Sequence, residues 1–131
     1  MREIRVALAG VGNCASALIQ GVHYYRNAKA DETVPGLMHV QFGDYHIRDV
    51  KFVAAFDVNR DKIGKDLSEA IFVEPNCCVK FADVPKLNVK VLPGPAQDGV
   101  APHMKDSFRL YNEKDYERVE VSDVLKSTQA D

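Results

Sequence analysis

An apolar run that breaks at two glycines restricts the fold of this chain more than any other feature of its sequence. Residues 4–9 are nearly all apolar, which is typical of a strand covered on both faces in a parallel sheet. Gly10 and Gly12 follow at once. Beyond them, apolar residues recur every three or four positions: Ala15, Leu18, Val22 and Tyr25. We therefore expect a strand, a glycine turn, and a helix over about residues 13–26 with one buried stripe.

The glycine turn has the form GxGxxA, directly after a predicted strand and at the start of a predicted helix. In that setting Gly10 allows a tight turn, Gly12 lets a pyrophosphate approach the backbone, and Ala15 lets the helix pack closely on the strand. The helix N-terminus adds unpaired N–H groups and a partial positive charge. The pattern favours dinucleotide binding. The alternatives are a nucleoside cofactor such as S-adenosylmethionine, or a plain strand-to-helix turn that needs glycine.

A dinucleotide site also needs an acid at the end of the neighbouring strand, where it binds the adenosine ribose hydroxyls. Asp57 meets this condition because it follows the apolar residues 50–56. Asp31 and Glu32 lie nearer the usual spacing, but no predicted strand precedes them. A carboxylate at Asp57 would repel a 2′-phosphate, so the sequence favours NAD over NADP. The alternative for Asp57 is a helix-capping carboxylate.

The rest of the chain predicts a few further elements. Residues 27–49 are irregular but too apolar for a free linker, and we interpret them as an ordered insertion. Asn59 is a predicted N-cap for a helix. The apolar side of that helix would carry Ile63, Leu67, Ala70 and Ile71. Alternation over residues 87–91 predicts a third strand, and apolar residues over 121–125 predict a short helix.

This order of elements predicts an α/β, Rossmann-like fold with a parallel sheet. Three strands are predicted, whereas a complete dinucleotide-binding sheet has about six. We therefore interpret residues 1–131 as one partial domain, the N-terminal part of such a fold.

Composition narrows the class of protein. The chain has 131 residues, 46% of them hydrophobic, and a net charge of −2, as expected for one soluble globular domain without the basic surplus that suits nucleic acid. No apolar run approaches the ~20 residues that would span a membrane. Three cysteines cannot all pair within the chain, which favours a reducing cytoplasm.

The other candidate sites are less specific. Residues 94–99 follow the third predicted strand and could contact a cofactor, but a surface turn is an equal interpretation. Cys14, at a helix N-terminus, is either an activated thiol or, more commonly, a small buried side chain. The four histidines have no spacing that indicates metal ligation.

Several segments together match one family: residues 6–16, 20–25, 34–40, 42–46, 49–58, 66–71, and 94–95 with 98–99. Through them the chain resembles the N-terminal part of inositol-3-phosphate synthase, in the shorter form found in bacteria and archaea. The likeness is dense to about residue 99. The segment VPGLMHV over residues 34–40 is far more specific than the glycine motif.

The resemblance implies an NAD-dependent isomerase of inositol and phospholipid biosynthesis. Such enzymes convert D-glucose 6-phosphate to 1D-myo-inositol 3-phosphate by oxidation at C5, intramolecular aldol closure and reduction, so that NAD is regenerated. They are commonly homotetramers. Carried over to this sequence, the resemblance implies cofactor contacts from Gly10, Val11, Gly12, Asn13, Cys14 and Ala15, with Asp57 and Asp66 on the adenosine side.

The chain also departs from the family. Its members are more than twice as long, and their catalytic lysines lie beyond the point that matches Asp131. We therefore expect no catalytic residue in these 131 residues. We also expect that they are part of a truncated or split chain. The alternative is a non-catalytic NAD-binding or assembly module. With a partial sheet and exposed insertion residues, we expect a marginally stable chain that self-associates.

Overall fold

The structure is a computed structural model that describes residues 2–97 and 100–131. It contains, in chain order, β1 (Ile4–Ala9), α1 (Asn13–Tyr25), β2 (Gln41–Phe42), β3 (Tyr45–His46), β4 (Val50–Asp57), α2 (Leu67–Ala70), β5 (Val91–Pro93) and α3 (Val121–Thr128). Single 3₁₀ turns occur at Ile47–Asp49, Pro102–Met104 and Glu113–Asp115.

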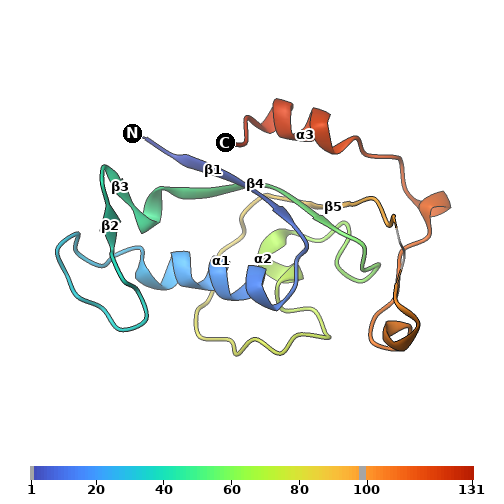
Figure 1. The fold of residues 1–131 in the computed structure, drawn as a ribbon, viewed down its shortest axis with the longest axis horizontal. Coiled ribbons are helices and arrows are strands. Elements are labelled where there is room, and N and C mark those ends of the chain that lie inside the picture. The colour runs from blue at the N-terminus through green and yellow to red at the C-terminus, as the bar shows by residue number, and fades with distance from the viewer. Residues whose placement is uncertain (1, 98–99) are drawn as a thin grey trace.

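The main sheet is parallel and has the order β1-β4-β5 (Figure 1). β1 pairs with β4 from Ile4 opposite Val50 to Ala9 opposite Phe56, with one irregularity after Val6. Figure 1 shows α1 and α2 on one side of the sheet and α3 on the other. The predicted α/β class and parallel sheet are therefore confirmed. None of the helices described is long and apolar enough to cross a membrane.

The core lies between the sheet and the two helices that follow the first strands. Its buried members are Val11, Ile19, Ala55, Leu67, Ala70, Ile71, Val89 and Val91. The predicted stripe of α1 is partly wrong, because Ile19 is buried while Leu18 is 45% exposed. β1 is only half-buried, which differs from the expected fully covered strand, and it forms an edge of the described sheet.

The helix predicted after Asn59 is much shorter than expected. Gly64 has a φ of +87°, in the left-handed region that ends a right-handed helix. Its N–H donates to the carbonyl of Val91, so this part of the chain pairs with β5 instead of coiling. The helix starts only after Asp66, which caps it. The third strand was likewise predicted too early, because β5 begins at Val91.

The insertion is ordered and tied to the end of α1. β2 and β3 form a small antiparallel hairpin within it. The Nε2 atom of the buried His46 lies 2.9 Å from the carbonyl oxygen of Ala28. The Tyr25 hydroxyl donates to the Pro35 carbonyl at 2.7 Å. The hairpin side keeps apolar groups in solvent, since Met38 is 89% and Phe42 77% exposed.

The C-terminal helix returns the chain to β1. The backbone N–H of Asp131 donates to the carbonyl of Arg5 at 2.9 Å, and the Arg5 N–H donates to the Asp131 carboxylate at 2.8 Å. The Arg5 guanidinium also donates to the Thr128 carbonyl. These bonds place the end of the chain along the outer edge of β1.

Candidate functional site

The glycine turn joins β1 to α1 with an open backbone surface. Gly10 has a φ of +95°, which favours glycine, and its N–H donates to the Phe56 carbonyl at 2.8 Å. Gly12 is the N-cap of α1, and no side chain of the described residues caps the helix there. A Cβ built on Gly12 would meet no described atom within 4 Å. A ligand could therefore approach this backbone closely.

Asp57 lies at the end of β4, directly beside the turn. One of its carboxylate oxygens accepts the Val11 N–H at 2.6 Å, and the other accepts the Asn59 N–H at 2.7 Å. The structure thus brings together the two parts of the motif that the sequence analysis paired. The capping alternative is also partly realised, but the carboxylate caps the loop after β4 and the glycine turn, not a helix.

Lys62 completes the contacts around the turn, although the sequence does not predict this role. Its side chain is buried, with only 5% of the residue exposed. Its Nζ donates to the Val11 carbonyl at 2.5 Å. The loop reverses over Asn59, whose carbonyl accepts the N–H groups of Lys62 and Ile63, and this turn directs Lys62 back toward β1. Lysine is normally exposed, so the sequence pattern held no signal for this placement.

Asp66 is the N-cap of α2. Its carboxylate accepts the N–H and hydroxyl of Ser68 at 3.0 and 2.6 Å, and the Leu87 N–H at 3.0 Å. Burial raises the pKa of Asp66, but the hydrogen bonds from Ser68 and from the backbone of Leu87 and Asn88 outweigh it and hold the pKa below its usual value. Its cofactor contact stays a prediction, and the bonds described here serve the fold.

The first turn of α1 carries the other residues that the sequence analysis singled out. The Asn13 side-chain oxygen accepts the Cys77 N–H at 2.9 Å, which fixes the loop after α2 against the helix end. Ala15 is buried, as its close packing on the strand predicts. Cys14 is exposed, so the expectation of a small buried side chain is wrong, and all three cysteines are free thiols.

A hollow of about 660 Å³ opens at the same edge of the sheet, where β5 ends. It is lined by residues 93–97 and by parts of 111–122. The buried Tyr111 hydroxyl donates to the Gly94 carbonyl at 2.7 Å, and the Gly94 N–H donates to the Asp57 carbonyl at 2.9 Å. Burial, and secondarily Glu113, raises the pKa of Tyr111. Of the predicted loop 94–99, Asp98 and Gly99 lie outside the described residues.

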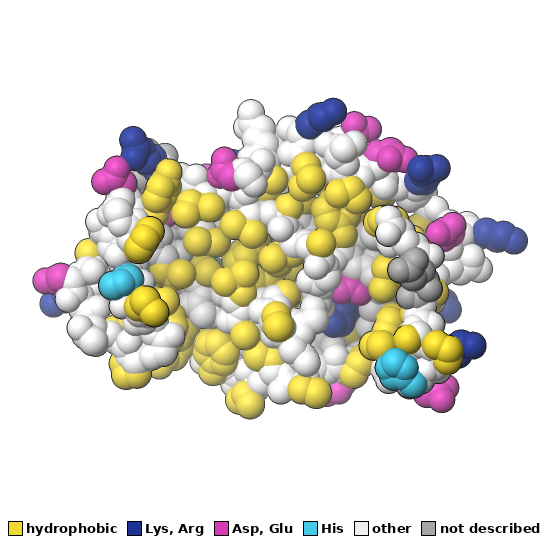
Figure 2. Space-filling view, in the orientation of Figure 1, with side chains coloured by type: hydrophobic (Ala, Val, Ile, Leu, Met, Phe, Trp, Pro, Cys, Tyr) yellow, Lys and Arg dark blue, Asp and Glu magenta, His cyan; other side chains and the backbone are white. Residues whose placement is uncertain are grey.

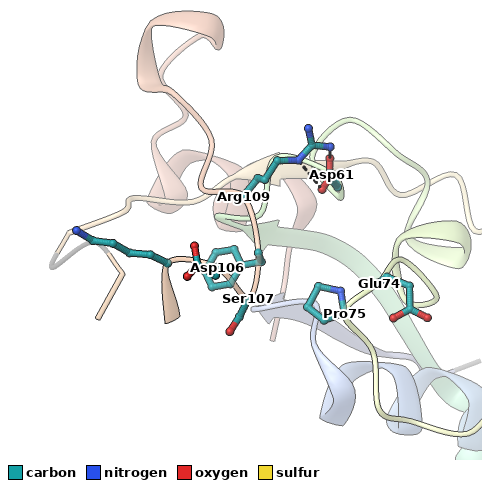
Figure 3. A pocket seen from close by; sticks show the side chains of 8 residues that line it. Asp61, Glu74, Pro75, Asp106, Ser107 and Arg109 are labelled. Atoms are coloured by element: carbon teal, nitrogen blue, oxygen red, sulfur yellow. Dashed lines mark hydrogen bonds and ion pairs between the residues drawn. The ribbon is translucent and has the colours of Figure 1, made fainter. Parts of the chain in front are cut away.

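A second, shallower cleft of about 530 Å³ lies between the loop after β4 and residues 105–109. Figure 3 shows the Arg109 guanidinium directed at Asp61, with the Glu74 carboxylate pointing away from them. The Arg109–Asp61 contact of 2.5 Å is solvent-exposed on the arginine side. Glu74, Lys105 and Asp106 also line the cleft, so Arg109 and Asp61 account for only part of its charge.

Comparison with known proteins finds close relatives for nearly the whole chain. It is 57% identical over 129 residues to the inositol-3-phosphate synthase of Mycolicibacterium smegmatis, 54% over 128 residues to that of Corynebacterium glutamicum, and 55% over 129 residues to that of Mycobacterium tuberculosis. These matches cover 98% of the chain but only 34–35% of each relative. No family model matches the chain.

Solved structures agree on the fold. The crystal structure of Ari2 matches 98% of the chain and 36% of its own, with a TM-score of 0.73 and 28% identity. A myo-inositol-1-phosphate synthase-related protein from Thermotoga maritima matches 87% of the chain and 28% of its own, with a TM-score of 0.56 and 24% identity. The chain is thus homologous to inositol-3-phosphate synthase over about a third of that protein's length.

Proposed function

We propose that the chain is the NAD-binding, N-terminal part of an inositol-3-phosphate synthase, which isomerises D-glucose 6-phosphate to 1D-myo-inositol 3-phosphate. The sequence identity to three named synthases supports the reaction. One geometric observation carries the cofactor assignment: the Asp57 carboxylate lies within hydrogen-bond distance of the open glycine turn. That pair of features, at the carboxyl edge of a parallel sheet, suits a dinucleotide.

The residues of the turn fit the pyrophosphate. The N–H groups at the start of α1, from Gly12 to Ala15, lack the intrahelical partners that later residues have, and the helix dipole makes this end electropositive. The space beyond Gly12 is open. Gly10 sets the turn and Val11, which is fully buried, anchors it in the core. Asn13 and Cys14 present the next backbone groups.

Asp57 fits the adenosine ribose. A carboxylate has about four acceptor positions, and the two backbone N–H groups that it accepts here leave room for the two ribose hydroxyls. We also propose that Asp66 contacts the adenosine side. It can accept fewer further hydrogen bonds than Asp57, because Ser68 and Leu87 already donate to one of its oxygens.

When bound, NAD supplies reversible oxidation at a sugar carbon. The residues of this chain bind and orient that cofactor, and we assign no catalytic residue among them. Closing the six-membered ring requires acid–base groups that belong to the remaining length of the synthase.

Calorimetric titration of NAD into the chain tests the cofactor assignment. In Gly12→Ala, the new methyl group enters open space, so the fold should persist, while NAD affinity should fall at least about ten-fold because the methyl occupies the path of the phosphate. Gly21→Ala is the matched control, since a Cβ there also meets no described atom, but lies midway along α1. Equal affinity in all three proteins, or no binding by folded wild type, would contradict the assignment.

The synthase assignment needs a separate assay. Mixing this chain with the separately expressed remainder of the M. smegmatis synthase should produce inositol phosphate from glucose 6-phosphate, and Gly12→Ala should abolish the product. NAD binding without any product from the mixture would favour the non-catalytic module instead.

A further inference from the structure

Lys62 is the one lysine or arginine among the buried side chains of the described chain. Removing an ammonium group from water is costly unless another group compensates it. No carboxylate in the described residues forms an ion pair with it. Its Nζ instead donates to the Val11 carbonyl at 2.5 Å. A buried charge has therefore been placed on the backbone of the glycine turn.

Val11 is consequently held at both of its backbone groups. Asp57 accepts its N–H, and Lys62 donates to its carbonyl. Asp57 is the last residue of β4, and Lys62 lies in the loop that follows this strand. Val11 itself is fully buried and cannot move without opening the core.

The planarity of the peptide bond gives this contact a direction. In a trans peptide the carbonyl and the following N–H point in opposite directions. Because Lys62 holds the Val11 carbonyl inward, the N–H of Gly12 points away from Lys62. That N–H has no hydrogen-bond partner among the described residues, and the space beside Gly12 is open.

We infer that Lys62 is a positioning residue for a diphosphate: by holding the Val11 carbonyl it directs the Gly12 N–H at a phosphate oxygen. Its positive charge behind the turn adds attraction for the same anion. This inference rests on the proposed cofactor function and deepens it. It assigns Lys62 to the phosphates and leaves Asp57 to the ribose, so the two residues should affect different parts of one ligand.

The test compares ADP with adenosine, which differ only in the diphosphate. Lys62→Met removes the donor and keeps an apolar side chain of similar length, whereas Lys65→Met removes a charge from an exposed position in the same loop. Calorimetry should show about ten-fold weaker ADP binding to Lys62→Met, as expected for loss of a hydrogen bond from a charged group, and a nearly unchanged adenosine affinity. Lys65→Met should match the wild type for both ligands.

A purely structural role predicts a different result. Equal losses for ADP and adenosine in Lys62→Met, or no loss for either, would overturn the inference. If the wild type binds neither ADP nor NAD, the cofactor function itself fails, and the inference falls with it.

A measurement on the wild type covers the case in which Lys62→Met does not fold. The ε-methylene NMR signals of Lys62 should shift when ADP is added and remain in place with adenosine. Identical spectra with both ligands would overturn the inference.

Discussion

Asp57 serves the fold and the proposed cofactor site with the same two oxygens, which makes it the most informative residue to replace. In Asp57→Asn, one oxygen becomes an NH₂ group that faces a backbone N–H of Val11 or Asn59. We expect the free energy of unfolding to fall by ~2 kcal/mol, the cost of an unsatisfied buried group. Urea unfolding at neutral pH measures this loss.

Asp61→Asn is the matched control, four residues further along the same loop. Its partner Arg109 is largely exposed, so losing this ion pair should cost at most about 1 kcal/mol. A loss in Asp57→Asn no larger than that in Asp61→Asn would show that the contacts of Asp57 to the turn contribute little.

Asp66 should make the stability depend on acidity. Its pKa is lower in the folded chain than in the unfolded one, so its contribution is complete above the unfolded value of about 3.9. The contribution is lost as pH falls through the lower folded pKa. Asp66→Asn keeps a capping side chain that does not ionise. We expect urea midpoints for this variant to fall less steeply than those of the wild type between about pH 5 and 2.

The exposed Asp31 gives the control for that titration. Asp31→Asn should leave the acid dependence unchanged. Parallel curves for the wild type and Asp66→Asn would contradict a lowered pKa for Asp66.

At the residue scale, the sequence predicts candidate cofactor-binding residues that lie directly after the end of a strand. Gly10, Gly12 and Asp57 were identified because parallel strands end at one edge of a sheet. Lys62 was not, since its burial depends on a loop reversal that no periodicity reports. Of the two interpretations of Cys14, the buried side chain is wrong, because Cys14 is exposed on the same side of α1 as Leu18.

At the scale of elements, Gln20 joins α1 to the loop that follows α2. It is fully buried, and its side-chain oxygen accepts the N–H groups of Phe81 and Ala82 at 2.7 and 3.1 Å. Its nitrogen donates to Ser16 and to the Val79 carbonyl. The side-chain amide of Gln20 therefore provides hydrogen-bond partners for backbone groups of an irregular segment that does not belong to a sheet.

Gln20→Leu should release that loop while leaving the parallel sheet in place. The Phe81 and Ala82 N–H groups would lose their acceptor, so their hydrogen exchange should accelerate, and the free energy of unfolding should fall by about 2 kcal/mol. Gln41→Leu, which loses one exposed bond to Gly43, is the control. Unchanged exchange at positions 81 and 82 would argue against this role of Gln20.

Helices and strands were predictable where the spacing of apolar residues is regular. They were not predictable where hydrogen bonds to a distant strand compete with that spacing. β1, α1 and β4 form where the apolar pattern predicts them, although the buried stripe of α1 includes Ile19 and not Leu18. The segment 59–67 has helical spacing at Ile63 and Leu67, but the Gly64 N–H donates to Val91 of β5 and the Leu67 N–H to Val89 just before it. Tertiary pairing therefore decides the conformation of this segment. The buried face was right, and the helix length was wrong.

For the whole molecule, exposed apolar surface is the dominant feature. Figure 2 shows hydrophobic side chains gathered across the middle of one face, where Figure 1 places β1 and β4. Val79, Met38 and Phe42 are each more than three-quarters exposed elsewhere on the surface. Surface of this kind is normally covered in a stable protein.

We therefore expect the isolated chain to self-associate. Sedimentation velocity should show a mass that rises with concentration, and the melting temperature should depend on concentration. Replacing Met38 and Phe42 with serine should weaken the association, whereas the same exchange at the less exposed Leu125 should have less effect. A sharp, concentration-independent transition of a monomer would refute the prediction.

The contact between His46 and Ala28 has a consequence for engineering. It joins the two ends of the insertion between α1 and β4, so that the insertion forms a closed loop. The cost of closing a loop grows only slowly with its length. Residues 29–45 could therefore be shortened, lengthened or exchanged for a foreign segment, and the strand–turn–helix unit that carries Gly12 and Asp57 would keep its geometry.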